Sequence, residues 1–175
     1  MTTPFAESTD LIEVDAHSLD DNFFKIIEKD WFLVTAGDKD NYNTMTANWG
    51  GVGYLWHKKV CFIFVRPVRY TYQFTESSDL FTLSFFDDKF RKQLDYCGVK
   101  SGREVDKVKE CGFTPYEIDG GGITFNEARL VIKCRKIYRQ DIDPGGFMDE
   151  SIAKNYPQKD YHTLYIGEIV KVLKK

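Results

Sequence analysis

Two arginines and a threonine lie within a six-residue stretch, where an apolar run ends. Residues 65–71 read V-R-P-V-R-Y-T, with arginines on both sides of a proline. A guanidinium donates paired hydrogen bonds to phosphate oxygens, and a threonine hydroxyl and free helix N-terminal N–H groups add donors. The alternative is a solvated basic turn, because charged residues are common at strand ends. The candidate phosphate site comprises Arg66, Pro67, Arg69, Tyr70 and Thr71.

The preceding segment alternates hydroxyl or amide side chains with apolar ones. Residues 43–49 read N-T-M-T-A-N-W, which has the period of a strand with two different faces. Such a strand offers backbone donors and an apolar wall, the groups that hold a flat ring such as an isoalloxazine. The alternative is that Met45 and Trp49 are ordinary core residues. The candidate ring site comprises Asn43, Thr44, Met45, Thr46, Ala47, Asn48 and Trp49.

Two further segments could complete this site. Ser84, Phe85 and Phe86 end an apolar run and could close the other side of the ring, although a core position at a strand end is the slightly better interpretation. In S-G-R at 101–103, Gly102 permits a tight turn, and Arg103 and Lys107 are spaced to share one helix face. With Ser101 they could meet the phosphates of a ligand, or they could form a surface helix cap.

His162 follows Asp160-Tyr161 at the start of the last apolar run. A carboxylate nearby could bias its charge, so His162 is a candidate catalytic proton donor or nicotinamide contact. A lone histidine is more often structural or exposed. The sequence contains no GxGxxG, GxSxG, HExxH or P-loop motif, so it offers no support for a Rossmann nicotinamide site.

The composition favours an ordinary soluble domain. The chain has 175 residues, of which 42% are hydrophobic and 15% aromatic, and its net charge of −3 gives no bulk attraction to nucleic acid. Residues 1–10 lack a signal-peptide pattern and no run reaches the ~20 apolar residues of a membrane span, so we expect a cytoplasmic protein with no membrane partner. Four dispersed cysteines without metal-ligand spacing predict neither a metal site nor a disulfide framework.

The elements that must position these residues are mainly strands. Apolar runs predict strands at 31–36, 44–49, 60–65, 80–86, 113–118, 128–140 and 161–173, with Gly50–Gly53 breaking the second and an extended lead-in or edge strand over 1–17. Short helices are predicted over 23–30, 70–76, 87–98 and up to Glu110. Sequential strands without a βαβ rhythm indicate an antiparallel barrel, and the absence of linkers or repeats indicates one domain over residues 1–175.

Four separated motifs resemble one family. They are N-T-M-T-A-N-W-G-G at 43–51, V-R-P-V-R-Y-T at 65–71, S-G-R-E-V-D-K at 101–107 and D-Y-H-T-L-Y-I-G-E-I at 160–169. Together they resemble the flavin reductase-like, FMN-binding split-barrel proteins, flavoredoxin-type included, from about Trp31 to the C-terminus. The resemblance implies a six-stranded antiparallel split β-barrel with short flanking helices, and a homodimer with FMN at or near the subunit interface.

The same resemblance implies roles for the candidate residues. It places residues 44–49 along the flavin, Arg66, Arg69 and Thr71 at the FMN phosphate, and residues 84–86 near the ring. Ser101, Gly102 and Lys107 would approach from the side. Many members carry a Ser-x-Thr phosphate pair, and Arg69 stands here in the position of that serine. Phosphate binding would then depend more on guanidinium groups.

Two activities fit this resemblance. The first is an NAD(P)H-dependent FMN reductase, with NAD(P)H as co-substrate and hydride passing to the flavin. The second is an FMN-binding electron carrier that is reduced by a redox protein partner and has no nicotinamide site. A pyridoxamine-phosphate oxidase relative fits the motifs less well, and haem binding would require His57 or His162 as axial ligand.

Overall fold

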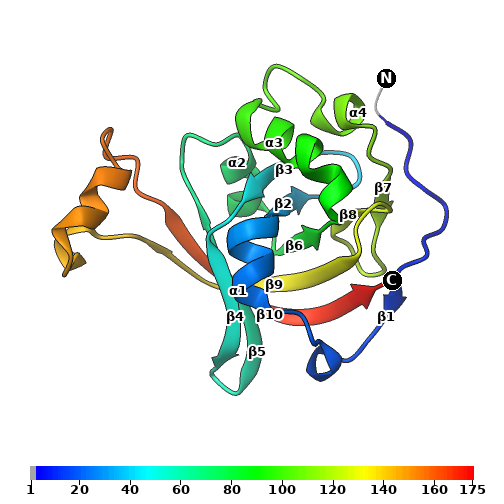
Figure 1. Ribbon diagram of the computed structural model, residues 1–175, viewed down its shortest axis with the longest axis horizontal. Coiled ribbons are helices and arrows are strands. Elements are labelled where there is room, and N and C mark those ends of the chain that lie inside the picture. The colour runs from blue at the N-terminus through cyan, green and yellow to red at the C-terminus, as the bar shows by residue number, and fades with distance from the viewer. Residues whose placement is uncertain (1–2) are drawn as a thin grey trace.

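The apolar runs pair into one large antiparallel sheet in the computed structural model of the protein, which describes residues 3–175 (Figure 1). The eight-stranded sheet has the order β3-β2-β6-β9-β10-β5-β4, with β1 paired to the end of β10, and β7 and β8 form a separate pair. The strands are β1 (Ile12–Glu13), β2 (Phe32–Gly37), β3 (Tyr42–Ala47), β4 (Gly50–Leu55), β5 (Lys58–Val65), β6 (Leu80–Phe85), β7 (Pro115–Glu117), β8 (Ile123–Phe125), β9 (Leu130–Asp141) and β10 (Thr163–Lys174).

The helices are short. The first is a single α-helical turn that continues as a π-helix. The helices are α1 (Phe23–Lys25), its continuation η2 (Ile26–Asp30), α2 (Thr71–Ser77), α3 (Arg91–Val99) and α4 (Lys107–Cys111), with 3-10 turns η1 (Ala16–Ser18), η3 (Asp88–Phe90), η4 (Pro144–Gly146) and η5 (Glu150–Asn155). No helix within residues 3–175 is both long and apolar enough to cross a bilayer. The mainly β antiparallel fold is confirmed, with eight strands in the sheet instead of six.

Alternating side chains give the sheet two packed faces. One core cluster takes residues from β2, β3, β5, β6, β9 and β10, so it lies within the curl of the sheet. Residues of the opposite parity, such as Leu33 of β2 and Val131 of β9, pack instead against α3, α4 and the β7–β8 pair. Figure 1 shows these elements gathered on one side of the sheet. The alternation predicted for residues 128–140 is confirmed.

The curl requires a glycine in the last strand. Gly167 lies at a register shift between β10 and β9, and a Cβ at this position would meet Cys134 Cβ and Phe81 Cζ, each at 2.6 Å. A larger residue would therefore push β10 away from the core.

The predicted break at Gly50–Gly53 is wrong, because these residues begin β4 and pair with β5. Gly51 allows the aromatic ring of Phe62 to lie across the strand, since a Cβ at Gly51 would come within 2.5 Å of Phe62 Cζ.

The lead-in predicted for residues 1–17 includes the edge strand β1, while residues 1 and 2 lie outside the described part.

The two ends of the sheet are consecutive in the chain. β3 and β4 are the terminal strands of the sheet order, and only Asn48 and Trp49 separate them in sequence. The sheet must therefore curl until its edges approach each other. The ends of β3 and β5 and the start of β10 meet near this connection. The loop between β9 and β10 carries η4 and η5 and extends away from the rest of the molecule (Figure 1).

Candidate functional site

A cavity of about 320 Å³ opens where the two sheet edges are joined, within the ~300–1,000 Å³ range of small-molecule sites. It is bounded by the end of β3, the connection to β4, the end of β5 and the start of β10. Its lining residues are Met45, Thr46, Ala47, Asn48, Trp49, Phe64, Arg66, Arg69 and His162. All of them except Phe64 belong to the sets predicted from the sequence.

Arg69 lines this cavity with a guanidinium whose hydrogen bonds are incomplete. Its Nη1 donates to the carbonyl oxygen of Gly98, at the end of α3, over 2.8 Å. Its Nη2 is buried and has no hydrogen-bond partner among the described residues. Burial lowers the pKa of Arg69, and the positive charge of Arg66 lowers it further. An anion in the cavity would satisfy the free donor and offset both unfavourable effects.

The guanidinium of Arg66 is bonded to the loop between β9 and β10. Its Nη1 forms a 2.9 Å ion pair with Asp160, and its Nη2 donates to the carbonyl oxygen of Asn155 over 2.8 Å. The guanidinium also lies 5.2 Å from the ring centre of Tyr156. Arg66 therefore fixes the loop beside the cavity, whereas Arg69 carries the buried terminal nitrogen that has no partner among the described residues.

His162 is held at the cavity as a buried imidazole. Its Nδ1 shares a 2.9 Å hydrogen bond with the hydroxyl of Tyr156, and its ring centre lies 4.9 Å from that of Trp49. Burial, followed by the charge of Arg66, lowers the pKa of His162 to about 4, although Asp160 acts in the opposite direction. The imidazole is consequently neutral at pH 7, a state that makes it a poor proton donor.

The end of β3 forms a firm apolar wall. Met45 and Ala47 are buried in the core cluster inside the curl, and Thr46 on the other face donates its hydroxyl to the carbonyl oxygen of Leu94 in α3. Trp49, by contrast, is 41% exposed. The site thus combines a fixed strand with one side that is open to solvent, as a bound flat ring with a reactive face requires.

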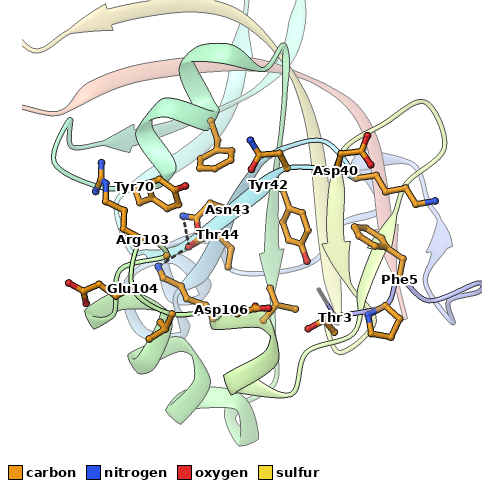
Figure 2. Close-up of a pocket in the computed structure, with 18 residues that line it drawn as sticks. Thr3, Phe5, Asp40, Tyr42, Asn43, Thr44, Tyr70, Arg103, Glu104 and Asp106 are labelled. Carbon is orange, nitrogen blue, oxygen red and sulfur yellow. Dashed lines mark hydrogen bonds between the residues drawn. The ribbon is translucent and has the colours of Figure 1, made fainter. Parts of the chain in front are cut away.

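A second, larger cavity of about 770 Å³ is lined by other residues that were predicted to belong to the site (Figure 2). Asn43, Thr44, Tyr70, Gly102 and Lys107 line it. Figure 2 shows Tyr70 and Arg103 at one end and Thr3 and Phe5 at the other. The formal charges of its lining balance, because it includes three cationic residues, Lys39, Arg103 and Lys107, and three carboxylates, Asp40, Glu104 and Asp106. This cavity consequently lacks the positive character of the smaller one.

Lys107 is a structural cation in that larger cavity. Its Nζ is buried and donates to the carbonyl oxygens of Thr44 and Cys97, each over 2.9 Å. Burial lowers the pKa of Lys107 to about 8. Gly102 lies so close to Asn43 that a Cβ would come within 2.1 Å of its Oδ1. These residues support β3 from the larger cavity and do not line the smaller one.

The remaining predicted residues line neither cavity. The hydroxyl of Thr71 is buried and accepts a 2.7 Å hydrogen bond from Asn43 Nδ2, so it is committed within the protein. Pro67 lies in the turn before α2, and the hydroxyl of Ser101 accepts from the backbone N–H of Arg103.

The structure does not bring Ser84, Phe85 and Phe86 to the ring site. The hydroxyl of Ser84 is buried against Thr124 of β8 over 2.8 Å, and Phe85 packs on Phe32 inside the curl. Phe86 packs on Phe113 in the opposite cluster. Their placement follows from β6, which is a central strand covered on both faces.

Sequence reasoning missed three parts of the site. Phe64 alternates in the structure with the buried positions of β5, but residues 60–65 are all apolar, so the sequence does not distinguish the two faces. Tyr156 and Asn155 reach the site only through the fold of the loop between β9 and β10, and no local pattern marks them.

Comparisons with known proteins identify the family of the chain. The sequence model of the family described as "Flavin reductase like domain" matches residues 26–175. Flavoredoxin of Desulfovibrio vulgaris (Miyazaki F) is 26% identical, with 83% of this chain and 69% of that chain covered and a TM-score of 0.65. No curated protein sequence matched the chain.

Two more distant solved structures share the fold. The FMN-binding domain of a flavin reductases-like enzyme from Shewanella baltica OS155 is 17% identical, with coverages of 95% and 78% and a TM-score of 0.67. An NADH:FAD oxidoreductase of Streptomyces globisporus C-1027 is 16% identical, with coverages of 83% and 75% and a TM-score of 0.64.

Proposed function

This chain belongs to the family of flavin reductase-like domains, and from that premise we propose that it is an FMN-dependent oxidoreductase. FMN binds in the 320 Å³ cavity, with its phosphate at Arg69 and its ring along residues 45–49. When bound, FMN supplies the redox chemistry, as acceptor and donor of hydride or electrons. The protein supplies binding, orientation and charge.

The observation that carries the proposal is the unsatisfied Nη2 of Arg69. A buried guanidinium donor without a partner costs stability, and the neighbouring charge of Arg66 adds to that cost. A phosphate is the group that best relieves both. Arg66 would contribute mainly through its charge, since each of its terminal nitrogens already has a partner in the loop between β9 and β10.

His162 serves in this proposal as a positioning residue. The positive charge of Arg66 lowers its pKa, so a phosphate between the arginines would raise the pKa again. The imidazole packs against Trp49 and bonds to Tyr156, and it therefore fixes one side of the cavity. A proton-donating role would require this rise of pKa on ligand binding.

The reaction of the leading proposal is hydride transfer from NAD(P)H. The family name and the NADH:FAD oxidoreductase among the structural neighbours support it, and the exposed Trp49 leaves access to the ring. The second candidate is an electron carrier with a protein redox partner. The neighbour at 26% identity, a flavoredoxin, favours that reading.

One anaerobic experiment separates the two. The FMN-loaded protein is mixed with NADH or NADPH, and the visible absorbance of oxidised flavin is followed. Rapid bleaching with either nucleotide supports the reductase. Bleaching by dithionite or a reduced ferredoxin alone, with no response to either nucleotide, would reject the reductase and support the carrier.

A homodimer is part of the proposal. The hairpin of β4 and β5 exposes large apolar side chains, with Tyr54 71% and Trp56 55% exposed, and such groups are common in subunit contacts. Sedimentation of the FMN-loaded protein at micromolar concentration tests it, and a sedimentation coefficient of a monomer would refute it.

A further inference from the structure

Two cysteine sulfurs lie close together beside the candidate flavin site. Cys97 of α3 and Cys111 of α4 have their Sγ atoms 3.7 Å apart, and both thiols are free. Cys97 is fully buried, whereas Cys111 is partly exposed. A disulfide needs the sulfurs to approach to about 2.05 Å, a shift that side-chain rotation and a small movement of the five-residue helix α4 can supply.

The surroundings make the two thiols unequal. The hydrogen bond with Cys97 lowers the pKa of Cys111, and the positive charge of Lys107 lowers it further, although partial burial opposes both. The same hydrogen bond, together with burial, raises the pKa of Cys97. The more exposed sulfur is thus also the better nucleophile, which is the arrangement of an attacking and a resolving cysteine.

We propose that Cys97 and Cys111 form a redox-active dithiol that hydrogen peroxide converts reversibly to a disulfide. The Cys111 thiolate attacks one peroxide oxygen, the O–O bond breaks, and a sulfenic acid and one water form. The Cys97 sulfur then attacks the Cys111 sulfur, and the S–O bond breaks with release of a second water. The two thiols lose two electrons and two protons in all, and the peroxide is reduced to two waters.

The other two cysteines provide an internal comparison. Cys61 and Cys134 lie in adjoining positions of the core inside the curl and are both fully buried. Burial raises the pKa of Cys134 well above its usual value. Peroxide should leave this pair reduced, since neither sulfur is accessible to it.

A short chain of contacts links the dithiol to Arg69. The carbonyl oxygen of Cys97 accepts from Lys107, and that of the next residue, Gly98, anchors Arg69 Nη1. Drawing Cys97 toward α4 should move this anchor and misalign the guanidinium. This second step rests on the proposed function, because it assumes that Arg69 holds the FMN phosphate. We expect the disulfide to weaken FMN binding about fivefold or more.

The test begins with thiol chemistry, which does not depend on flavin. The protein is treated with stoichiometric peroxide, free thiols are alkylated, and the digested peptides are mapped by mass. The proposal predicts a Cys97–Cys111 disulfide that dithiothreitol reverses, with Cys61 and Cys134 alkylated only after unfolding. Oxidation of the exposed Met148 is distinguished because dithiothreitol does not reverse a sulfoxide.

The matched variants are Cys111→Ser and Cys97→Ala. Neither can form the disulfide, and the proposal predicts that Cys97→Ala accumulates sulfenic acid at Cys111, which a dimedone probe captures. Sulfinic acid at Cys111 of the wild type, or no change at either cysteine, would overturn the proposal.

The FMN dissociation constant of reduced and oxidised wild type, measured by flavin fluorescence, tests the coupling. An equal constant in both states overturns the coupling while leaving the disulfide standing. If neither the reduced nor the oxidised protein binds FMN, the proposed function itself is contradicted.

Discussion

Replacement of Arg69 by alanine should selectively weaken the binding of a flavin that carries a phosphate. The side chain lines the 320 Å³ cavity, its Nη1 is anchored on Gly98, and its Nη2 has no partner among the described residues. Arg66 cannot readily replace it, since both of its terminal nitrogens are engaged by the β9–β10 loop.

The expected loss is that of a hydrogen bond to a charged group, about 1.5–3 kcal/mol. At 1.4 kcal/mol for each factor of ten, this corresponds to an increase of roughly 10- to 150-fold in the FMN dissociation constant. Riboflavin lacks the phosphate, so its dissociation constant should change by less than about threefold, equivalent to the few tenths of a kcal/mol of an indirect effect.

The assay is fluorescence titration of FMN and riboflavin against wild type and Arg69→Ala. Arg103→Ala is the charge-matched control, because Arg103 lines the larger cavity and its charge lies over the ring of Tyr70. Thermal unfolding of all three proteins establishes that they are folded. Equal losses for FMN and riboflavin, or an FMN loss as large in Arg103→Ala, would refute the assignment of Arg69 to the phosphate.

Two further predictions concern stability. His162 has a pKa of about 4 in the folded protein against 6.5 when unfolded, so the unfolded state binds more protons between these pH values. As the pH falls from 6.5 to 4, the wild type should lose at most about 3 kcal/mol of unfolding free energy relative to His162→Gln, measured by urea unfolding. Parallel pH profiles of the two proteins would disprove the buried neutral imidazole. Gly167→Ala should destabilise by about 1–3 kcal/mol or more, since its Cβ would meet Cys134 and Phe81 at 2.6 Å. Gly53→Ala, with Phe62 no nearer than 4.0 Å, should be tolerated, and equal destabilisation of the two variants in chemical unfolding would contradict the packing argument.

Much of the fold could be predicted because apolar runs have clear periods. The alternation of residues 128–140 and the apolar run at 60–65 gave β9 and β5, and both strands contribute buried residues to the core inside the curl. The glycine-rich β4 was missed because its residues contribute little side-chain pattern. Its pairing depends on the neighbouring β5 and on Phe62, which packs across Gly51.

The site could be predicted only in part, for a physical reason. Local spacing identified residues 45–49 and both arginines, but it made Arg66 and Arg69 equivalent. The difference between them comes from Asp160 and Asn155, which lie about 90 residues away in sequence and reach Arg66 through the fold of a loop. Likewise, the strand pattern of residues 80–86 could not show that β8 covers Ser84.

The most direct test of the account is a crystal structure of the protein with FMN. We expect a phosphate oxygen within hydrogen-bond distance of Arg69 Nη2 and the ring against Met45, Ala47 and Trp49. An FMN molecule in the larger cavity beside Asn43 and Gly102, or a phosphate with no contact to Arg69, would contradict it.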